Sequence, residues 1–227
     1  MARVTSTQPA PRGLSDLGPL AQLRAGRLVR RLPQLVVGLF LYGVSLGLMV
    51  RGELGLAPWD VLHLGVTRHL PLTLGQAVIV LSFVVLLAWI PLREVPGLGT
   101  LLNAVVVGLS ADLTLVLLEA PEGLVARLAL TIGGVLLCGF AGALYIGAQL
   151  GRGPRDGLMT GLSRRTGRSL RLVRTSIEVT VLVLGLLLGG VAGAGTVLYA
   201  VAIGPLTQLM LPACTVAVRE DLSAGSR

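Results

Sequence analysis

Two aspartates that could bind a ligand lie between long apolar segments and occur in the same short motif. Asp60 ends the stretch LGLAPWD and Asp156 ends LGRGPRD, 96 residues further along the chain. An ionisable side chain among apolar segments is costly to bury and is usually kept for a task. The alternative interpretation is that each aspartate only caps a short helix, because it falls near the third helical position, where the helix dipole favours a carboxylate. The residues that would break and restart the helices are Gly55, Pro58, Gly151 and Pro154.

Further polar side chains lie in or beside apolar runs, and we interpret them as candidates for lining a binding cavity. His63 follows Asp60 by three residues, on the same helical face, which suggests a metal or proton-relay role, whereas the equivalent position after the second motif is Met159 and argues against it. A polar residue inside an apolar helix can line a cavity or hydrogen-bond to a neighbouring helix. The remaining candidates are Asn103, Asp112 and Gln208, and two glycines, Gly99 and Gly195, precede threonines that could cap helices.

The amino-acid composition predicts that membrane helices position these candidate residues. Hydrophobic residues make up 53% of the 227-residue chain and charged residues only 13%. A soluble domain carries nearer a quarter charged residues, so the sequence predicts an all-α integral membrane protein. The net charge is +8 and all 19 basic residues are arginine, placed beside apolar runs, which favours an anionic membrane surface over nucleic acid. Because lysine is absent, a P-loop is excluded, and no catalytic or metal-binding motif is present. We therefore expect no enzyme activity, cofactor or metal.

Six apolar runs are long enough to cross a bilayer. Two shorter segments, 58–69 and 154–166, follow the two aspartate motifs and are predicted to be helices that begin at the motif proline without spanning. They either re-enter the membrane or lie at its surface. The six predicted spans are Leu35–Val50, Leu74–Leu92, Leu98–Leu118, Leu124–Leu150, Ser169–Leu188 and Gly195–Leu211.

The arginines predict the orientation of these spans. If the N-terminus lies in the cytoplasm and the short segments do not cross, 16 arginines fall inside and three outside. Cytoplasmic loops of membrane proteins carry the excess of basic residues. The sequence thus predicts a multi-pass protein of the cytoplasmic membrane with both termini in the cytoplasm and with anionic lipid at its cytoplasmic arginines.

The chain contains an internal repeat. Aligned without a gap, residues 31–113 and 127–209 are identical at 26 of 83 positions, including both motifs and several glycines. Two consecutive halves of three spans each must enter the membrane in opposite directions, so the repeat predicts an inverted architecture with a polar cavity between the halves. The expected divisions are a basic, partly disordered cytoplasmic tail (1–30), a first repeat (31–118), a second repeat (119–211) and a cytoplasmic tail (212–227).

Four stretches carry a resemblance to a known family: GLAPWDVLHLGV, PGLGTLLNAVVVGLSAD, GRGPRDGLMTGLSRRTGRSLRLVRTSIE and GAGTVLYAVAIGP. They resemble the YczE/YyaS/YitT group of bacterial membrane proteins and are closest to the YczE type, over about residues 31–211. The resemblance implies a multi-span protein of the cytoplasmic membrane and adds little on substrate. The long C-terminal soluble domain of the YitT branch is absent, so any role tied to it is not carried over.

Three functions fit these features. The first is a secondary or passive transporter or exporter of an unknown small molecule, with its site between the repeats. The second is a channel, and the third is an accessory protein that positions a partner through its basic cytoplasmic loop. The substrate, the direction of movement and the coupling ion are open at this stage, and so is the formation of a homo-oligomer.

Overall fold

The structure, a computed structural model, describes residues 18–218, and within them every regular element is a helix and no strand is present. The predictions for residues 1–17 and 219–227 lie outside the described residues. The helices are α1 (Pro19–Arg24), α2 (Leu28–Gly52), α3 (Pro58–Thr67), α4 (Leu74–Leu92), α5 (Leu98–Leu117), α6 (Leu124–Gly147), α7 (Pro154–Thr166), α8 (Leu170–Leu187) and α9 (Ala194–Cys214).

Five of these helices are long and apolar enough to cross a membrane: α2, α4, α5, α6 and α9. Their bounds agree closely with the predicted spans except that α2 begins earlier, at Leu28, and runs through Pro33. α8 occupies the sixth predicted span, but Arg171, Arg174 and Glu178 in its first half lower its apolar character. The structure thus shows a multi-span helical fold, whereas the sixth span stays a prediction.

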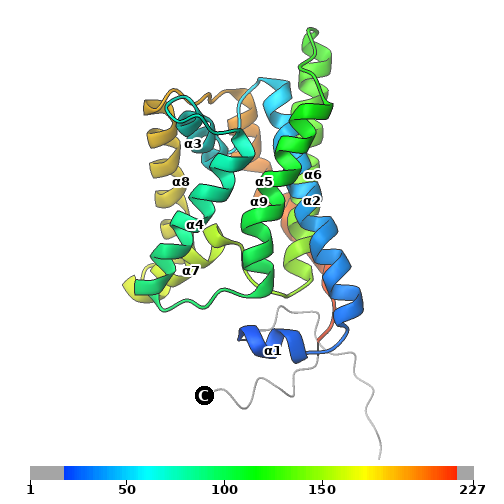
Figure 1. Ribbon diagram of the computed structural model, residues 1–227, viewed down its shortest axis with the longest axis vertical. Helices are drawn as coiled ribbons and strands as arrows, with labels where there is room; N and C mark the ends of the chain where they lie inside the picture. The colour runs from blue at the N-terminus through cyan, green and yellow to red at the C-terminus, as the bar shows by residue number, and fades with distance from the viewer. Residues whose placement is uncertain (1–17, 219–227) are drawn as a thin grey trace, which may run out of the picture.

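The short helices α3 and α7 lie at opposite ends of the bundle, beside α4 and α8 (Figure 1). α2 packs along α6, while α5 packs against α2 and α9 against α6. α3 packs against α8 from the other half of the chain, and α7 packs against α4. Each short helix is therefore held by a long helix of the other half. The buried core contains Leu35, Leu39 and Val107 on one side and Met49, Val61 and Val135 on the other.

Two backbone hydrogen bonds cross between the halves where the aspartate motifs begin. The amide of Gly99 donates to the carbonyl of Leu150 at 2.7 Å, and the amide of Gly195 donates to the carbonyl of Leu54, also at 2.7 Å. Donors and acceptors of the two bonds occupy equivalent positions, 96 residues apart in the sequence. Each motif is thereby fixed to the first turn of a long helix from the other half.

A buried arginine links the segment around α1 to the helix bundle through hydrogen bonds. Arg31 is fully buried and donates hydrogen bonds to two carbonyls just after α6, those of Ala148 at 2.8 Å and Gln149 at 2.5 Å. It also donates to the carbonyls of Gln22 at 2.7 Å and Gly26 at 3.3 Å, on the segment that carries α1. Carbonyls at a helix C-terminus carry partial negative charge, so they accept a guanidinium without an acidic partner.

Candidate functional site

Both aspartate motifs break and restart the chain as their residue types predict. Gly55 and Gly151 have φ angles of +114° and +133°, in the region that glycine adopts without steric penalty. α3 then begins at Pro58 and α7 at Pro154, which confirms the prediction that each short helix starts at the motif proline. Because the aspartate is the third residue of each helix, its side chain lies at the N-terminal end.

Side chains from the N-terminal ends of α3 and α7 meet inside the protein. Nη2 of Arg155, the second residue of α7, lies 3.4 Å from Oδ1 of Asp60 in α3. The same carboxylate oxygen accepts a hydrogen bond from Nδ1 of His63 at 3.1 Å. The Arg155 guanidinium also lies over the indole of Trp59, 5.2 Å from the ring centre, in cation–π geometry. Trp59, Asp60 and His63 are buried and Arg155 is half-buried, and these four residues form a cluster that joins the two halves.

Burial and pairing set the protonation states in this cluster. Burial opposes ionisation of Asp60, but the hydrogen bond from His63 and the positive charge of Arg155 lower the pKa of Asp60 overall. Burial lowers the pKa of His63 despite its bond to Asp60. At neutral pH the cluster thus contains a carboxylate, a guanidinium and a neutral imidazole that donates its Nδ1 proton.

The second aspartate has different surroundings. Asp156 is half-buried and its Oδ2 accepts a hydrogen bond from the hydroxyl of Tyr145 at 2.7 Å. The ring of Tyr145 meets that of Tyr42 edge-on, with centroids 6.0 Å apart. Within residues 18–218, neither Asp156 nor Asp60 accepts a hydrogen bond from a backbone amide of its own helix. The contacts of both carboxylates among these residues therefore go to side chains.

Two cavities adjoin Asp156. A small one of about 50 Å³ is lined by both halves of the chain, and a larger one of about 510 Å³ extends from Asp156 toward α1. The small cavity is lined by Tyr42, Val78, Ser82, Asn103, Val107, Tyr145, Gly153, Pro154, Arg155 and Asp156. The larger cavity is lined by Gly18, Pro19, Gln22, Trp89, Arg93, Glu94, Val95, Ile146, Gln149, Gly151, Arg152, Asp156 and Arg164. Asp156 is shared by the two, so it stands where they approach one another.

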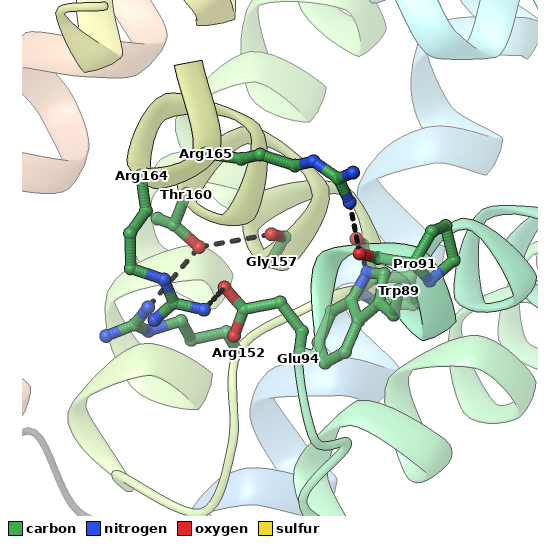
Figure 2. A network of polar contacts seen from close by, with 9 residues as sticks. Trp89, Pro91, Glu94, Arg152, Gly157, Thr160, Arg164 and Arg165 are labelled. Carbon is green, nitrogen blue, oxygen red and sulfur yellow. Dashed lines mark hydrogen bonds and ion pairs between the residues drawn. The ribbon is translucent and has the colours of Figure 1, made fainter. Parts of the chain in front are cut away.

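Polar contacts join α7 to the end of α4 (Figure 2). Of these residues, Trp89, Glu94 and Arg164 form one wall of the larger cavity. Arg164 donates to Glu94 at 2.7 Å, and Arg165 donates to the carbonyl of Pro91. Trp89 donates from Nε1 to the carbonyl of Pro154 at 3.0 Å. The indole of Trp89 also lies against Gly157, where a Cβ would overlap the ring. This wall holds the N-terminal end of α7, and with it Asp156, in place.

The other predicted residues divide into two groups. Asn103 lines the small cavity, beside the motif residue Gly153. Asp112 instead holds the start of α4, accepting from the Thr73 hydroxyl at 2.5 Å and the Gly75 amide at 2.7 Å. Gln208 is exposed on α9. The structure thus brings Asp60, His63, Asn103 and Asp156 into one region and leaves Asp112 and Gln208 outside it.

Residues 29–212 match the family described as "Family of unknown function (DUF6198)". The chain belongs to this family. It is 33% identical over 187 residues to the "Uncharacterized membrane protein YczE" of Bacillus subtilis, covering 82% of this chain and 87% of that protein. It is 26% identical over 180 residues to the protein YyaS of the same organism, covering 78% and 90%. These matches confirm the resemblance to YczE and YyaS.

A further relative is an uncharacterized protein of Haemophilus influenzae, 43% identical over 177 residues, covering 78% of this chain and 81% of the relative. No solved structure matches the chain. The membrane helices and the relationship to YczE together establish this DUF6198 member as a multi-pass membrane protein.

Three residues of the site escaped the sequence analysis: Arg155, Tyr145 and Trp89. At the equivalent positions the other half has Trp59, Met49 and Gly185. The two halves of this DUF6198 chain differ at these positions, so the repeat does not indicate them. A charged or aromatic residue that replaces an unrelated type at an equivalent position of the repeat is the feature of the sequence that indicates them.

Within residues 18–218, no three histidine, cysteine or acidic side chains gather to hold a metal ion.

Proposed function

We propose that this protein is a secondary or passive transporter of a small molecule, with its site between two inverted three-helix repeats. The observation that carries the proposal is the contact between Asp60 and Arg155 beside a cavity lined from both halves. Transporters with inverted repeats bind substrate at the repeat interface, at the ends of broken or short helices. Here side chains from the N-terminal ends of two short helices meet beside such a cavity.

The pairing of helices supports the inverted arrangement. α3 packs on α8 and α7 packs on α4, and the two crossed backbone bonds join equivalent positions. A twofold axis in the membrane plane would generate each of these pairs from the other. In this proposal α8 is the sixth span, because its 18 residues extend about 27 Å at 1.5 Å per residue. Both termini then lie in the cytoplasm, where the arginines contact anionic lipid.

Access to the site from each side of the membrane tests the proposal. Asn103 lines the small cavity, so an Asn103→Cys variant with Cys138 and Cys214 replaced by alanine places a single thiol there. In oriented proteoliposomes, a transporter that alternates between states exposes this thiol to membrane-impermeant reagents added on either side. A matched control is Gly133→Cys, on α6, where nothing lies within 4 Å of a Cβ.

Each outcome has a distinct meaning. Labelling from both sides without ionic conductance in planar bilayers supports the transporter. Conductance that needs no substrate identifies a channel instead. Labelling from one side only, together with a co-purifying protein, identifies an accessory role and overturns the proposal.

A further inference from the structure

We propose that the site binds a small organic cation, with a protonated amino group of the ligand held by Asp156 where the two cavities approach one another. This inference rests on the proposed function only for the statement that the cation is carried across the membrane. The binding of the cation depends on the charges, shape and walls of the site itself.

The charges of the site leave one carboxylate without a counter-ion. Asp60 has Arg155 within 3.4 Å, so these two opposite charges balance. Asp156, by contrast, has no basic side chain within ion-pair distance among residues 18–218. A partly buried carboxylate without a counter-ion is less stable than a paired one, so it gains from binding a cation. The net charge available to a ligand at this point is that of Asp156.

The hydrogen bonds of Asp156 leave room for such a ligand. Its Oδ2 accepts from the Tyr145 hydroxyl, whereas its Oδ1 accepts no hydrogen bond from any described residue. An ionised carboxylate can accept several hydrogen bonds, so an ammonium group could donate to both oxygens. The Tyr145 hydroxyl would then fix the orientation of the carboxylate.

The two cavities suit the two parts of an organic amine. The small cavity of about 50 Å³ is large enough for an ammonium or methylammonium group, and the larger one of about 510 Å³ can take the rest of a molecule. Tyr42 and Tyr145 line the small cavity and Trp89 the larger one. Aromatic faces attract cations, and they attract more strongly when water is excluded.

The arginines of the larger cavity do not reverse this preference. Arg164 is paired with Glu94 at 2.7 Å, and Arg152 donates to Thr160 at 3.3 Å. Arg93, Arg152 and Arg164 are all exposed, so water and salt screen their charges over about 8 Å at physiological ionic strength. An anion would be attracted by these arginines at the opening of the larger cavity and repelled by the carboxylate of Asp156 at its inner end.

Three probes with the same ring and different charges test the inference: benzylammonium, benzyl alcohol and benzoate. The chain has two tryptophans, Trp59 beside Arg155 and Trp89 in the larger cavity, so intrinsic fluorescence of the purified full chain reports binding. We expect saturable binding of benzylammonium alone. Asp156→Asn should raise its Kd at least about tenfold, which corresponds to 1.4 kcal/mol. Glu119→Gln, at an exposed position just after α5, is the matched acid-to-amide control and should bind as the unmodified protein does.

Other results would overturn the inference: tighter binding of benzoate, equal binding of all three probes, or an unchanged Kd in Asp156→Asn. Should Asp156→Asn not fold, Gly153→Ala serves instead, because its Cβ would lie 3.1 Å from Asp156 Oδ2 and narrow the small cavity. That variant should weaken benzylammonium binding, and an unchanged Kd would equally count against the site. Binding of benzylammonium without its counterflow into proteoliposomes would contradict the transporter proposal but support the cation site. Labelling of Asn103→Cys from both sides without benzylammonium binding would support the transporter proposal but contradict the cation site.

Discussion

Arg155 and Asp60 are brought within 3.4 Å of one another although 95 residues separate them along the chain. Removal of one partner from a buried ion pair leaves an uncompensated charge, at a cost of about 3 kcal/mol. We therefore expect Asp60→Asn to lower the apparent Tm of the detergent-solubilised protein strongly. Asp60→Asn combined with Arg155→Gln should recover much of the loss, because no lone charge remains. Additive effects of the two substitutions in a double-mutant cycle would show that the contact contributes no coupling.

The stability of the protein should decrease in acid because of His63. Burial lowers the pKa of His63 below its ordinary value of 6.5, so the unfolded chain takes up this proton before the folded chain does. The stabilisation is complete above pH 6.5 and declines as the pH falls toward the pKa of the folded state. Asp60 adds no loss in this window, because its own pKa is lowered and it stays ionised. Apparent Tm measured from about pH 7.5 to about pH 5.5 should fall in the unmodified protein and fall less in His63→Gln. Parallel curves for the two proteins would contradict this assignment.

Arg31 should be among the most sensitive positions for stability. Its guanidinium donates to four backbone carbonyls on two separate segments, and the bonds to Ala148 and Gln149 are buried. We expect Arg31→Ala to destabilise the protein by at least about 3 kcal/mol. Arg30→Ala, at the exposed neighbouring position, should change stability by less than about 0.5 kcal/mol. The comparison needs only thermal unfolding of both variants, and similar losses for the two would refute the special role of Arg31.

The contact between Gly157 and Trp89 should not tolerate an added methyl group. A Cβ at position 157 would overlap the indole ring, so Gly157→Ala should destabilise the protein by about 1–3 kcal/mol. The double variant Gly157→Ala with Trp89→Leu should be more stable than Gly157→Ala alone, since the smaller side chain relieves the overlap. Gly133→Ala is the control: nothing lies within 4 Å of its Cβ, and alanine favours helix, so a small gain is expected.

Reporter fusions test the proposed topology. With six spans and both termini in the cytoplasm, fusions at Gly123 and Gly190 should report outside and a fusion at Arg165 inside. A fusion at Arg165 that reports outside would remove the six-span arrangement. The α8 segment is the informative part, because Gly190 follows it directly.

Most of the fold was predictable from the sequence because helix boundaries are local features. Proline at the first helical position and glycine at positive φ determine where α3 and α7 begin, and both signals are visible in the motifs. The side-chain chemistry of the site was predictable only in part. Asp60 and His63 are three residues apart on one helix, so their contact follows from helical spacing.

The contacts of Arg155 and Tyr145 depend instead on how distant helices pack, and no local pattern determines that packing. The role of Asp112 likewise could not be predicted from local sequence. Its position in an apolar helix was compatible with lining a cavity or with a hydrogen bond between helices. In the packed structure its carboxylate accepts a hydrogen bond from the amide of Gly75.

The crossed bonds from Gly99 to Leu150 and from Gly195 to Leu54 also constrain the order of assembly during synthesis. A ribosome delivers Leu54 some 140 residues before Gly195, so the first motif is inserted long before its partner exists. Until then the carbonyl of Leu54 must be satisfied by water, lipid headgroups or the insertion machinery, because an unpaired carbonyl in hydrocarbon is costly. Neither half can pair the backbone at its own helix break, so each half reaches its native structure only after the other half has been inserted.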